Sequence, residues 1–312
     1  MAVHRVVIDC DPGQDDAVAL LLAMASPEDV DLLGITVVAG NVPLALTARN
    51  ARQVCELAGR TDVPVFAGAE CPLVRVLDTA EVVHGKSGMD GADLPEPRMP
   101  LQAMHAADFL AEAVMSEGAL ATLVALGPLT NIALALRRHP AMRARIARIC
   151  LMGGAAAGGN TTPVAEFNIH VDPEAAAEVF GSGVPIVMFG LDVTHRVLVT
   201  PQHVEALRAI GNRTGATMAR MLDFYTRFDR RRYGWKGGPL HDPCVVAWLL
   251  QPDLFGLRPA NVEVETERRF TTGQTVVDWH GISRRPPNAM VAHRADPEGF
   301  FELLFQRIAR LP

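Results

Sequence analysis

Four carboxylates are crowded into one short turn near the start of the chain. They are Asp9, Asp11, Asp15 and Asp16, and they lie between the apolar segment Val6–Ile8 and a run of helix-forming residues. Like charges a few ångströms apart repel, so each carboxyl would have a raised pKa unless a positive charge lay among them. Carboxylate oxygens prefer hard cations such as Ca²⁺ or Mg²⁺ to Zn²⁺. The turn therefore predicts a metal site at the carboxyl end of a strand, where open α/β folds bind ligands.

Two further segments carry polar residues that suit the binding of a sugar. Asn41 follows a second apolar segment and a glycine, at the same expected sheet edge, although Gly-Asn after a strand is more often only a turn. Asn160, Glu166 and Asn168 surround the ring of Phe167. Amides and carboxylates of this kind recognise a polyhydroxylated ring such as ribose, whose hydroxyls both donate and accept hydrogen bonds. Without the acidic turn, helix capping by these residues would be an equally good interpretation.

A third segment, His241-Asp242-Pro243, leads into the apolar helical run Cys244–Leu250. Asp242 is a good N-cap and Pro243 a good first helical residue, so the segment is explained as a well-started helix. An aspartate can also cap a helix and ligate a metal. Both interpretations therefore stay open for Asp242.

The composition is that of a globular protein, and the charge balance favours a small-molecule substrate. The chain has 312 residues, of which 49% are hydrophobic and 21% charged, and its net charge of −6 argues against a nucleic-acid groove or an anionic membrane surface. Its first long apolar stretch, Ala17–Ala25, is too short to span a bilayer and lacks a basic leader, so we expect no signal peptide or membrane anchor. The five cysteines show no C-x-x-C spacing, which indicates thiols in a reducing compartment and a cytoplasmic protein.

Strand-like and helical segments alternate through the first two thirds of the chain. This order predicts an open, mostly parallel, doubly wound (Rossmann-like) α/β sheet with helices on both faces and a C-terminal elaboration, all within one domain over residues 1–312. The strand candidates there are Val6–Cys10, Leu32–Val38, Leu120–Leu126, Ile146–Met152 and Pro185–Leu191. The helical candidates are Leu44–Ala58, Ala103–Ser116, Thr130–Arg138 and Pro173–Phe180. In the last third we expect helices at Gln202–Ile210, Thr214–Arg231, Asp242–Leu250 and from Pro297, and strands at Val262–Val264, Thr275–Val277 and Ala289–Val291.

The ordered set of motifs resembles the inosine/uridine-type nucleoside hydrolase family over nearly the whole chain. The motifs are D-x-D-P-G-x-D-D after the first strand, V-x-G-N one unit later, L-M-G-G and A-E-F-N in the middle, and H-D-P near residue 242. The resemblance implies Ca²⁺-dependent hydrolysis of the N-glycosidic bond of ribonucleosides to ribose and free base. Family members are commonly dimers or tetramers, so we expect a homo-oligomer.

The resemblance also assigns roles to individual residues. It places Ca²⁺ on Asp11, Asp16, Asp242 and the main-chain carbonyl of Leu126, a position where the family often has Thr or Ser and where only the backbone matters. It places ribose on five residues that match in type: Asp15, Asn41, Asn160, Glu166 and Asn168.

The mechanism that fits these residues is direct displacement by a metal-bound water whose proton Asp11 takes, through an oxocarbenium-like state. His241 is the candidate acid for the leaving base, against the alternative of a neutral histidine near the metal. His84 matches a position that approaches the base from a loop, and Phe167 provides an apolar wall.

The loops favour one substrate class over another. His84–Gly91 and Trp235–Cys244 look most like those of bacterial pyrimidine-preferring members, which predicts uridine and cytidine ahead of inosine. Broad specificity or a purine preference is the alternative within enzymes. Tyr225, in the region that closes over the base, is as readily explained by packing.

Other classes fit the sequence less well. A phosphatase of the haloacid dehalogenase type also begins with D-x-D after a strand, but it needs Thr or Val where Gly13 stands. An EF-hand needs glycine at loop position six, where Gln14 stands if Asp9 opens the loop. A non-catalytic, Ca²⁺-dependent nucleoside- or ribose-binding protein is the alternative from another class, and it would be favoured by loss of Asp11 or Asp242, both of which are present.

Overall fold

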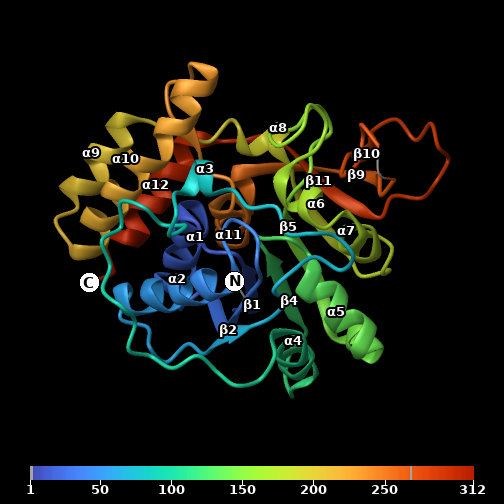
Figure 1. The fold of residues 1–312 in the computed structure, drawn as a ribbon, viewed down its shortest axis with the longest axis horizontal. Coiled ribbons are helices and arrows are strands. Elements are labelled where there is room, and N and C mark those ends of the chain that lie inside the picture. Colours follow the sequence, from blue (N-terminus) through green and yellow to red (C-terminus); the bar gives the residue numbers. More distant parts are fainter. Residues whose placement is uncertain (1–2, 268) are drawn as a thin grey trace.

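The fold is described from a computed structural model of the chain, which describes residues 3–267 and 269–312. A nine-stranded sheet runs through the described residues in the order β10-β9-β11-β6-β5-β4-β1-β2-β3 (Figure 1). The strands from β3 to β11 are parallel, and β9 and β10 extend the sheet by antiparallel pairing. Their bounds are β1 His4–Cys10, β2 Val30–Val37, β3 Val65–Ala67, β4 Ala121–Ala125, β5 Ile146–Met152, β6 Ile186–Phe189, β9 Phe255–Val264, β10 Thr275–Asp278 and β11 Ala289–Ala295.

The order of the strands reverses between β1 and β4. From β1 the chain winds to β2 and β3 on one side, whereas β4, β5 and β6 follow on the other. The loops that leave β1 and β4 therefore diverge and open a crevice at the carboxyl edge of the sheet. The acidic turn follows β1 directly, so this reversal places it in the crevice.

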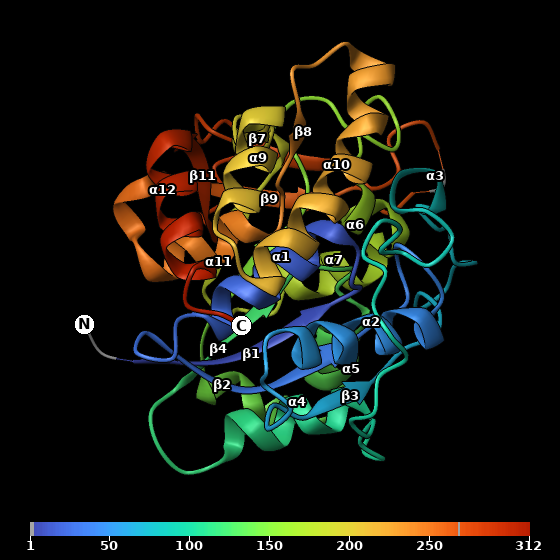
Figure 2. The same cartoon turned by 90° about the vertical axis from the view of Figure 1, so that its left-hand side faces the viewer.

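Helices cover both faces of the sheet, as Figure 2 shows with α4 on one side and α1, α11 and α12 on the other. Each face has its own hydrophobic core, as expected for buried parallel strands rich in Val, Ile and Leu. The helices of one face are α1 Gln14–Met24, α2 Leu44–Leu57, α9 Pro201–Ala209, α10 Arg213–Tyr233, α11 Pro243–Leu250 and α12 Pro297–Ile308, and those of the other are α4 Ala106–Met115, α5 Thr130–Arg138 and α7 Pro173–Phe180.

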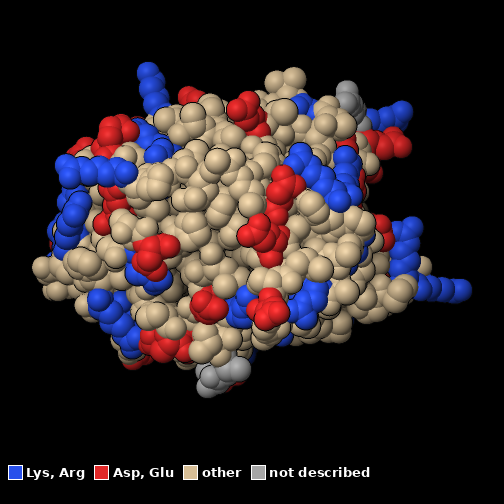
Figure 3. Space-filling model, turned by 90° about the horizontal axis from the view of Figure 1, so that it is seen from below, with Lys and Arg blue, Asp and Glu red and all other residues tan. Residues whose placement is uncertain are grey.

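Short elements connect these layers at the crevice. The helices are α3 Glu81–His84, α6 Phe167–Val171 and α8 Leu191–Thr194, and β7 Leu198–Val199 pairs with β8 Gly238–Pro239 in a separate two-stranded sheet. Two 3₁₀ turns lie at Pro140–Arg145 and Pro252–Leu254. On the face of the molecule seen in Figure 3, acidic and basic side chains are interspersed. No helix in the described part of the chain is both long and apolar enough to cross a membrane.

The predicted fold class is confirmed, and the missed elements have physical reasons. β3 has only three residues, too few to show a periodicity. The first half of β9 contains Gly256 and Pro259, which are rare within strands, so its pattern does not resemble a strand. α3, α6 and α8 are single turns or little more, and their tertiary contacts stabilise them rather than their own propensity.

A buried polar network ties the strands beneath the crevice together. Asp9 Oδ1 accepts hydrogen bonds from Thr36 Oγ1 at 2.6 Å and from Asn131 Nδ2 at 2.8 Å. Asn131 Oδ1 in turn accepts from the backbone N–H of Ala69 at 2.8 Å. The amide of Asn131 thereby links β1, β2 and the segment after β3, and a Cβ at Gly68 would lie only 2.0 Å from its Oδ1.

We expect Asn131→Ala to lower the free energy of unfolding by about 2–3 kcal/mol, because it leaves a buried N–H without a partner and removes a donor from a buried carboxylate. Urea denaturation measures this loss. Arg138→Ala is the control on the same helix, since it removes only a half-exposed ion pair with Asp108 and should cost less than about 1 kcal/mol. Equal losses from the two variants would show that the network adds nothing to stability.

Candidate active site

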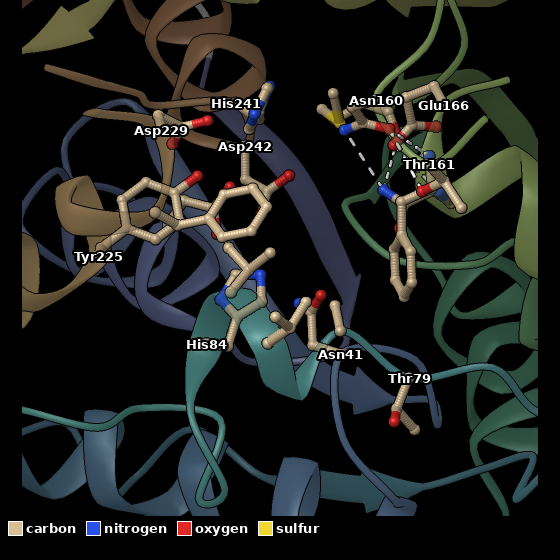
Figure 4. Close-up of a pocket in the computed structure, with 18 of the residues that line it drawn as sticks. Asn41, Thr79, His84, Asn160, Thr161, Glu166, Tyr225, Asp229, His241 and Asp242 are labelled. Atoms are coloured by element: carbon tan, nitrogen blue, oxygen red, sulfur yellow. Dashed lines mark hydrogen bonds between the residues drawn. The ribbon is translucent and has the colours of Figure 1, made fainter. Parts of the chain in front are cut away.

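A cavity of about 330 Å³ lies at the carboxyl ends of β1 and β4, a size suited to a small ligand. Its walls come from distant parts of the chain (Figure 4). Carboxylates from α1 and from the start of α11 line one part, and polar groups of α6 and the loop before it line the part opposite in the view. His84 on α3 and residues near the end of α10 line the remainder.

The acidic turn holds its carboxylates with backbone N–H groups. Asp15 and Asp16 lie in the first turn of α1, where the helix dipole favours negative charge. Asp16 Oδ1 accepts from the N–H of Asp11 at 3.2 Å, and its Oδ2 accepts from the N–H of Gly13 at 3.0 Å. The backbone of the turn therefore wraps around the carboxylate of Asp16.

Asp242 adds a carboxylate from the far end of the sequence to Asp11, Asp15 and Asp16. It stands at the N-cap position of α11, but its side chain makes no capping hydrogen bond. One of its oxygens lies within 4.8 Å of ligand oxygens of Asp15 and Asp16. Of the two interpretations left open by the sequence, the side chain thus supports membership of the acidic cluster, while Pro243 begins the helix as expected.

Asp11 is buried between two glycines. Its Oδ2 accepts from the backbone N–H of Asn41 at 2.6 Å, and the Nδ2 of Asn41 donates to Asp11 O at 3.1 Å and Asp16 Oδ2 at 3.3 Å. A Cβ at Gly40 would lie 2.1 Å from Asp11 Oδ2, and one at Gly127 would lie 2.5 Å from Asp11 Oδ1. Neither glycine was predicted to belong to the site, although Gly127 directly follows the predicted strand Leu120–Leu126 and Gly40 lies two residues after Leu32–Val38.

Burial dominates the electrostatics of the cluster. Desolvation raises the pKa of Asp15 to about 8 and of Asp16 to about 6, and it raises the pKa of Asp11 and Asp242 well above the ordinary range. Repulsion by neighbouring carboxylates adds to the rise for Asp11, Asp15 and Asp242, whereas hydrogen bonds limit it for Asp16. Asp11 Oδ1 and Asp15 Oδ1 are buried without a hydrogen-bond partner among the described residues. Orphaned hard oxygens in a cluster of acids fit a divalent cation such as Ca²⁺ or Mg²⁺.

The predicted metal ligands are brought together, with one difference in detail. The compact group of three consists of Asp15, Asp16 and Asp242, and Asp11 lies beside it through its contact with Asp16. The carbonyl of Leu126, also a predicted ligand, lines the cavity and accepts from Asn168 Nδ2 at 2.7 Å. The assignment of individual ligands stays a prediction.

The predicted ribose residues all line the same cavity, and several also serve the local fold. Glu166 caps α6 by accepting from the N–H groups of Asn168 at 2.9 Å and Ile169 at 3.2 Å, so the capping interpretation is confirmed for this residue. Burial raises its pKa to about 7. The amide Nδ2 of Asn168 donates to Leu126 O and Met152 O, so its Oδ1 is the atom that remains to accept from a ligand.

Asn160 and Phe167 complete this wall. Asn160 Oδ1 accepts from the N–H of Phe167 at 3.0 Å, so the amide NH₂ of Asn160 is the group that remains available. Phe167 is half-buried and lines the cavity, as predicted for an apolar wall.

The remaining wall contains predicted and unpredicted residues. His84 and His241 line this wall, as predicted. Tyr225 also lines the cavity, and its hydroxyl donates to Pro239 O at 2.9 Å. Sequence reasoning missed His195, whose ring lies edge-on to Trp235, and Asp229, whose pKa burial raises to about 6. His195 could have been found, because it closely follows strand β6 at the ligand edge of the sheet.

In the presence of a chelator, we expect thermal stability to fall as the pH rises from about 5 to about 8. The folded-state pKa values of Asp9, Asp15 and Asp16, about 7, 8 and 6, all lie above the unfolded value of 3.8, so the folded protein holds protons that the unfolded chain has lost. The predicted fall in Tm is several degrees, at about 2–4 °C per kcal/mol. Differential scanning calorimetry with and without Ca²⁺ measures it.

Added Ca²⁺ should reverse the fall, because a bound cation favours the ionised carboxylates. Asp15→Asn is the matched variant, since it removes one titrating group and should flatten the dependence in chelator. A Tm in chelator that stays constant or rises over this range would contradict the prediction.

The chain matches a family model and several known proteins over nearly its whole length. Residues 6–302 match the family described as inosine-uridine preferring nucleoside hydrolase. The chain is 48% identical to the pyrimidine-specific ribonucleoside hydrolase RihA of Enterobacter sp. (strain 638), over 98% of this chain and 97% of that protein. Among solved structures, a purine-preferring ribonucleoside hydrolase from Gardnerella vaginalis has a TM-score of 0.90 at 32% identity and covers 98% of both chains. A plant nucleoside hydrolase, PpNRh1, has a TM-score of 0.90 at 33% identity and covers 99% of both.

Proposed function

Because the chain belongs to the inosine-uridine preferring nucleoside hydrolase family, we propose that it is a Ca²⁺-dependent N-glycosidase that cleaves pyrimidine ribonucleosides, above all uridine and cytidine, to ribose and free base. The observation that carries the proposal is the buried acidic cluster, which stands beside a wall of amides and a carboxylate in one cavity. Sequence similarity to RihA supports the pyrimidine preference.

The donor set fits the cation. We propose that Asp11, Asp16, Asp242 and the carbonyl of Leu126 hold Ca²⁺, and the orphaned oxygen Asp11 Oδ1 supports this assignment. A bound Ca²⁺ supplies Lewis-acid chemistry, since it orients a water and lowers the pKa of that water. All other steps fall to side chains of the protein.

Asp11 is the proposed general base that takes the proton of the attacking water. Its position beside Gly40 and Gly127 holds the carboxylate in one place, as proton transfer requires. Asp15, Asn41, Asn160, Glu166 and Asn168 bind ribose in this proposal. Positive charge develops on the sugar in an oxocarbenium-like transition state, so the nearby carboxylates stabilise that state more than the substrate.

His241 is the proposed donor to the leaving base, with His84 as a second contact and Phe167 as an apolar wall. Burial lowers the pKa of the His241 imidazole well below its ordinary value, so the ring is neutral at pH 7. We therefore assign it a hydrogen bond donated from a neutral ring rather than proton transfer from an imidazolium.

The second candidate is a purine preference, and the Gardnerella enzyme favours it through its near-complete structural overlap. The higher identity to RihA favours pyrimidines. The family premise also supports a homo-oligomer, a dimer or tetramer, and the free cysteines, of which Cys10, Cys55, Cys150 and Cys244 are buried, support a cytoplasmic protein.

We expect the purified protein with Ca²⁺ to release reducing sugar from uridine and cytidine faster than from inosine or adenosine, and a chelator to abolish the release. Parallel assays of the four nucleosides measure both points. A ranking led by inosine would establish the purine preference instead. Tight nucleoside binding without sugar release would support the non-catalytic binding protein.

Asp11→Asn should lower kcat for uridine by at least about 100-fold, because it removes the base that takes the proton of water. It should also weaken Ca²⁺ binding, measured by calorimetric titration. Asp31→Asn is the control, since Asp31 is an exposed strand carboxylate 3.9 Å from Arg5, and its variant should match the parent protein. An Asp11→Asn variant with near-normal kcat would remove this residue from the mechanism.

A further inference from the structure

The buried amide of Gln14 fixes the hydrogen-bonding state of His84. Gln14 Nε2 donates to two backbone carbonyls, His84 O at 3.0 Å and Asp90 O at 3.2 Å. The opposite amide orientation would place an oxygen against both carbonyls, so Oε1 is the end that faces His84. That Oε1 lies 2.7 Å from His84 Nδ1 and accepts only, which requires a proton on Nδ1.

This proton leaves Nε2 of His84 as an acceptor. Burial lowers the pKa of the ring to about 4, so the imidazole is neutral at pH 7 and carries a single N–H. Gly13 permits the arrangement, because a Cβ there would lie 2.4 Å from His84 Nδ1. No hydrogen bond within the described part of the chain reaches Nε2, and His84 lines the cavity.

His241 is held in the opposite way. Its Nδ1 lies 2.8 Å from the hydroxyl of Thr194, a fully buried residue at the end of α8. A buried hydroxyl must donate its proton, and among the described residues the Thr194 hydroxyl makes no hydrogen bond other than the one to Nδ1. Thr194 therefore donates to Nδ1, which keeps Nδ1 unprotonated and leaves the ring proton on Nε2.

We propose that Gln14 and Thr194 are positioning residues that hold the two cavity histidines in opposite tautomers, so that His84 offers an acceptor and His241 a donor to the nucleobase. The identification of the ligand as a nucleobase rests on the proposed function, whereas the assignment of the two tautomers rests on the hydrogen bonds.

The hydrogen bonds with Gln14 and Thr194 explain how two neutral histidines can have different roles in one cavity. The leaving base gains negative charge as the glycosidic bond breaks, and the Nε2–H of His241 donates to it without a prior proton uptake. The acceptor on His84 binds a base that carries its own N–H donor, as uracil, cytosine and hypoxanthine do. If either histidine had the other tautomer, both rings would present donors, or both would present acceptors, to the base.

The first experiment observes the tautomers directly. Full-length protein labelled with ¹⁵N-histidine, in buffer with Ca²⁺, is examined by long-range ¹H–¹⁵N correlation, which distinguishes a protonated from an unprotonated ring nitrogen. Spectra of His84→Asn and His241→Asn identify the two signals by their loss. We expect Nδ1–H for His84 and Nε2–H for His241, and the reverse tautomer at either residue would overturn the proposal.

The second experiment separates positioning from mere support of the fold. Thr194→Val keeps the shape of the side chain but lacks the donor, so kcat for uridine should fall at least about 10-fold, with KM within about 3-fold, given that loss of one hydrogen-bond donor to a developing negative charge costs about 10²–10³-fold. Thr194→Ser keeps the hydroxyl and should restore kcat. With a p-nitrophenyl riboside, whose leaving group departs without a proton, Thr194→Val should differ little from the parent protein.

The outcomes also separate this inference from the proposed function. If no nucleoside is cleaved, the function fails while the spectra still decide the tautomers. If uridine is cleaved and Thr194→Val retains its kcat, the function stands and the role of Thr194 is wrong. Equal losses on uridine and on the p-nitrophenyl substrate would assign Thr194 a structural role only.

Discussion

The burial of the carboxylates of Asp11, Asp15, Asp16 and Asp242 at one end of the central strands is the constraint on which the rest of the site depends. Taking a carboxylate out of water costs several kcal/mol unless hydrogen bonds or opposite charge compensate. The protein supplies N–H groups from Asp11, Gly13 and Asn41 and the N-terminal dipole of α1. These donors leave Asp9 Oδ2, Asp11 Oδ1 and Asp15 Oδ1 without partners among the described residues, so the remaining cost is met by protonation, which the raised pKa values of Asp15 and Asp16 favour, or by the cation proposed above.

The same constraint explains the small residues around the cluster. Gly40 and Gly127 follow the strands that flank Asp11, and neither has room for a side chain. A methyl group at either place would force the carboxylate away from the N–H of Asn41. Beneath the cluster, Asp9 and Asn131 join the strands through buried hydrogen bonds, so the sheet edge is held rigidly where the carboxylates need fixed positions.

The fold and the charged half of the site could be predicted because both depend on local patterns. Buried parallel strands give continuous apolar segments, and D-x-D-P-G-x-D-D follows the first of them in the chain. The opposite wall of the cavity could be predicted only in part, since His84 and His241 belong to segments that the sequence singled out. His195 follows a strand at the ligand edge of the sheet but has no motif around it, and Asp229 belongs to a helix whose pattern indicates only an amphipathic surface. Their place in the cavity depends on how α8 and α10 pack, which is a tertiary property.

The first turn of α1 connects the two halves of the site. Asp15 and Asp16 face the acidic cluster, and Gln14, one residue earlier, holds the ring of His84 at the other wall. Successive residues of a helix point about 100° apart, so Gln14 and Asp15 project in different directions. Because this first turn faces into the cavity, the two side chains reach different walls. Movement of this turn would change the spacing of the carboxylates and the orientation of His84 together. The helix N-terminus thus holds the acidic cluster and the ring of His84 in a fixed relation across the cavity.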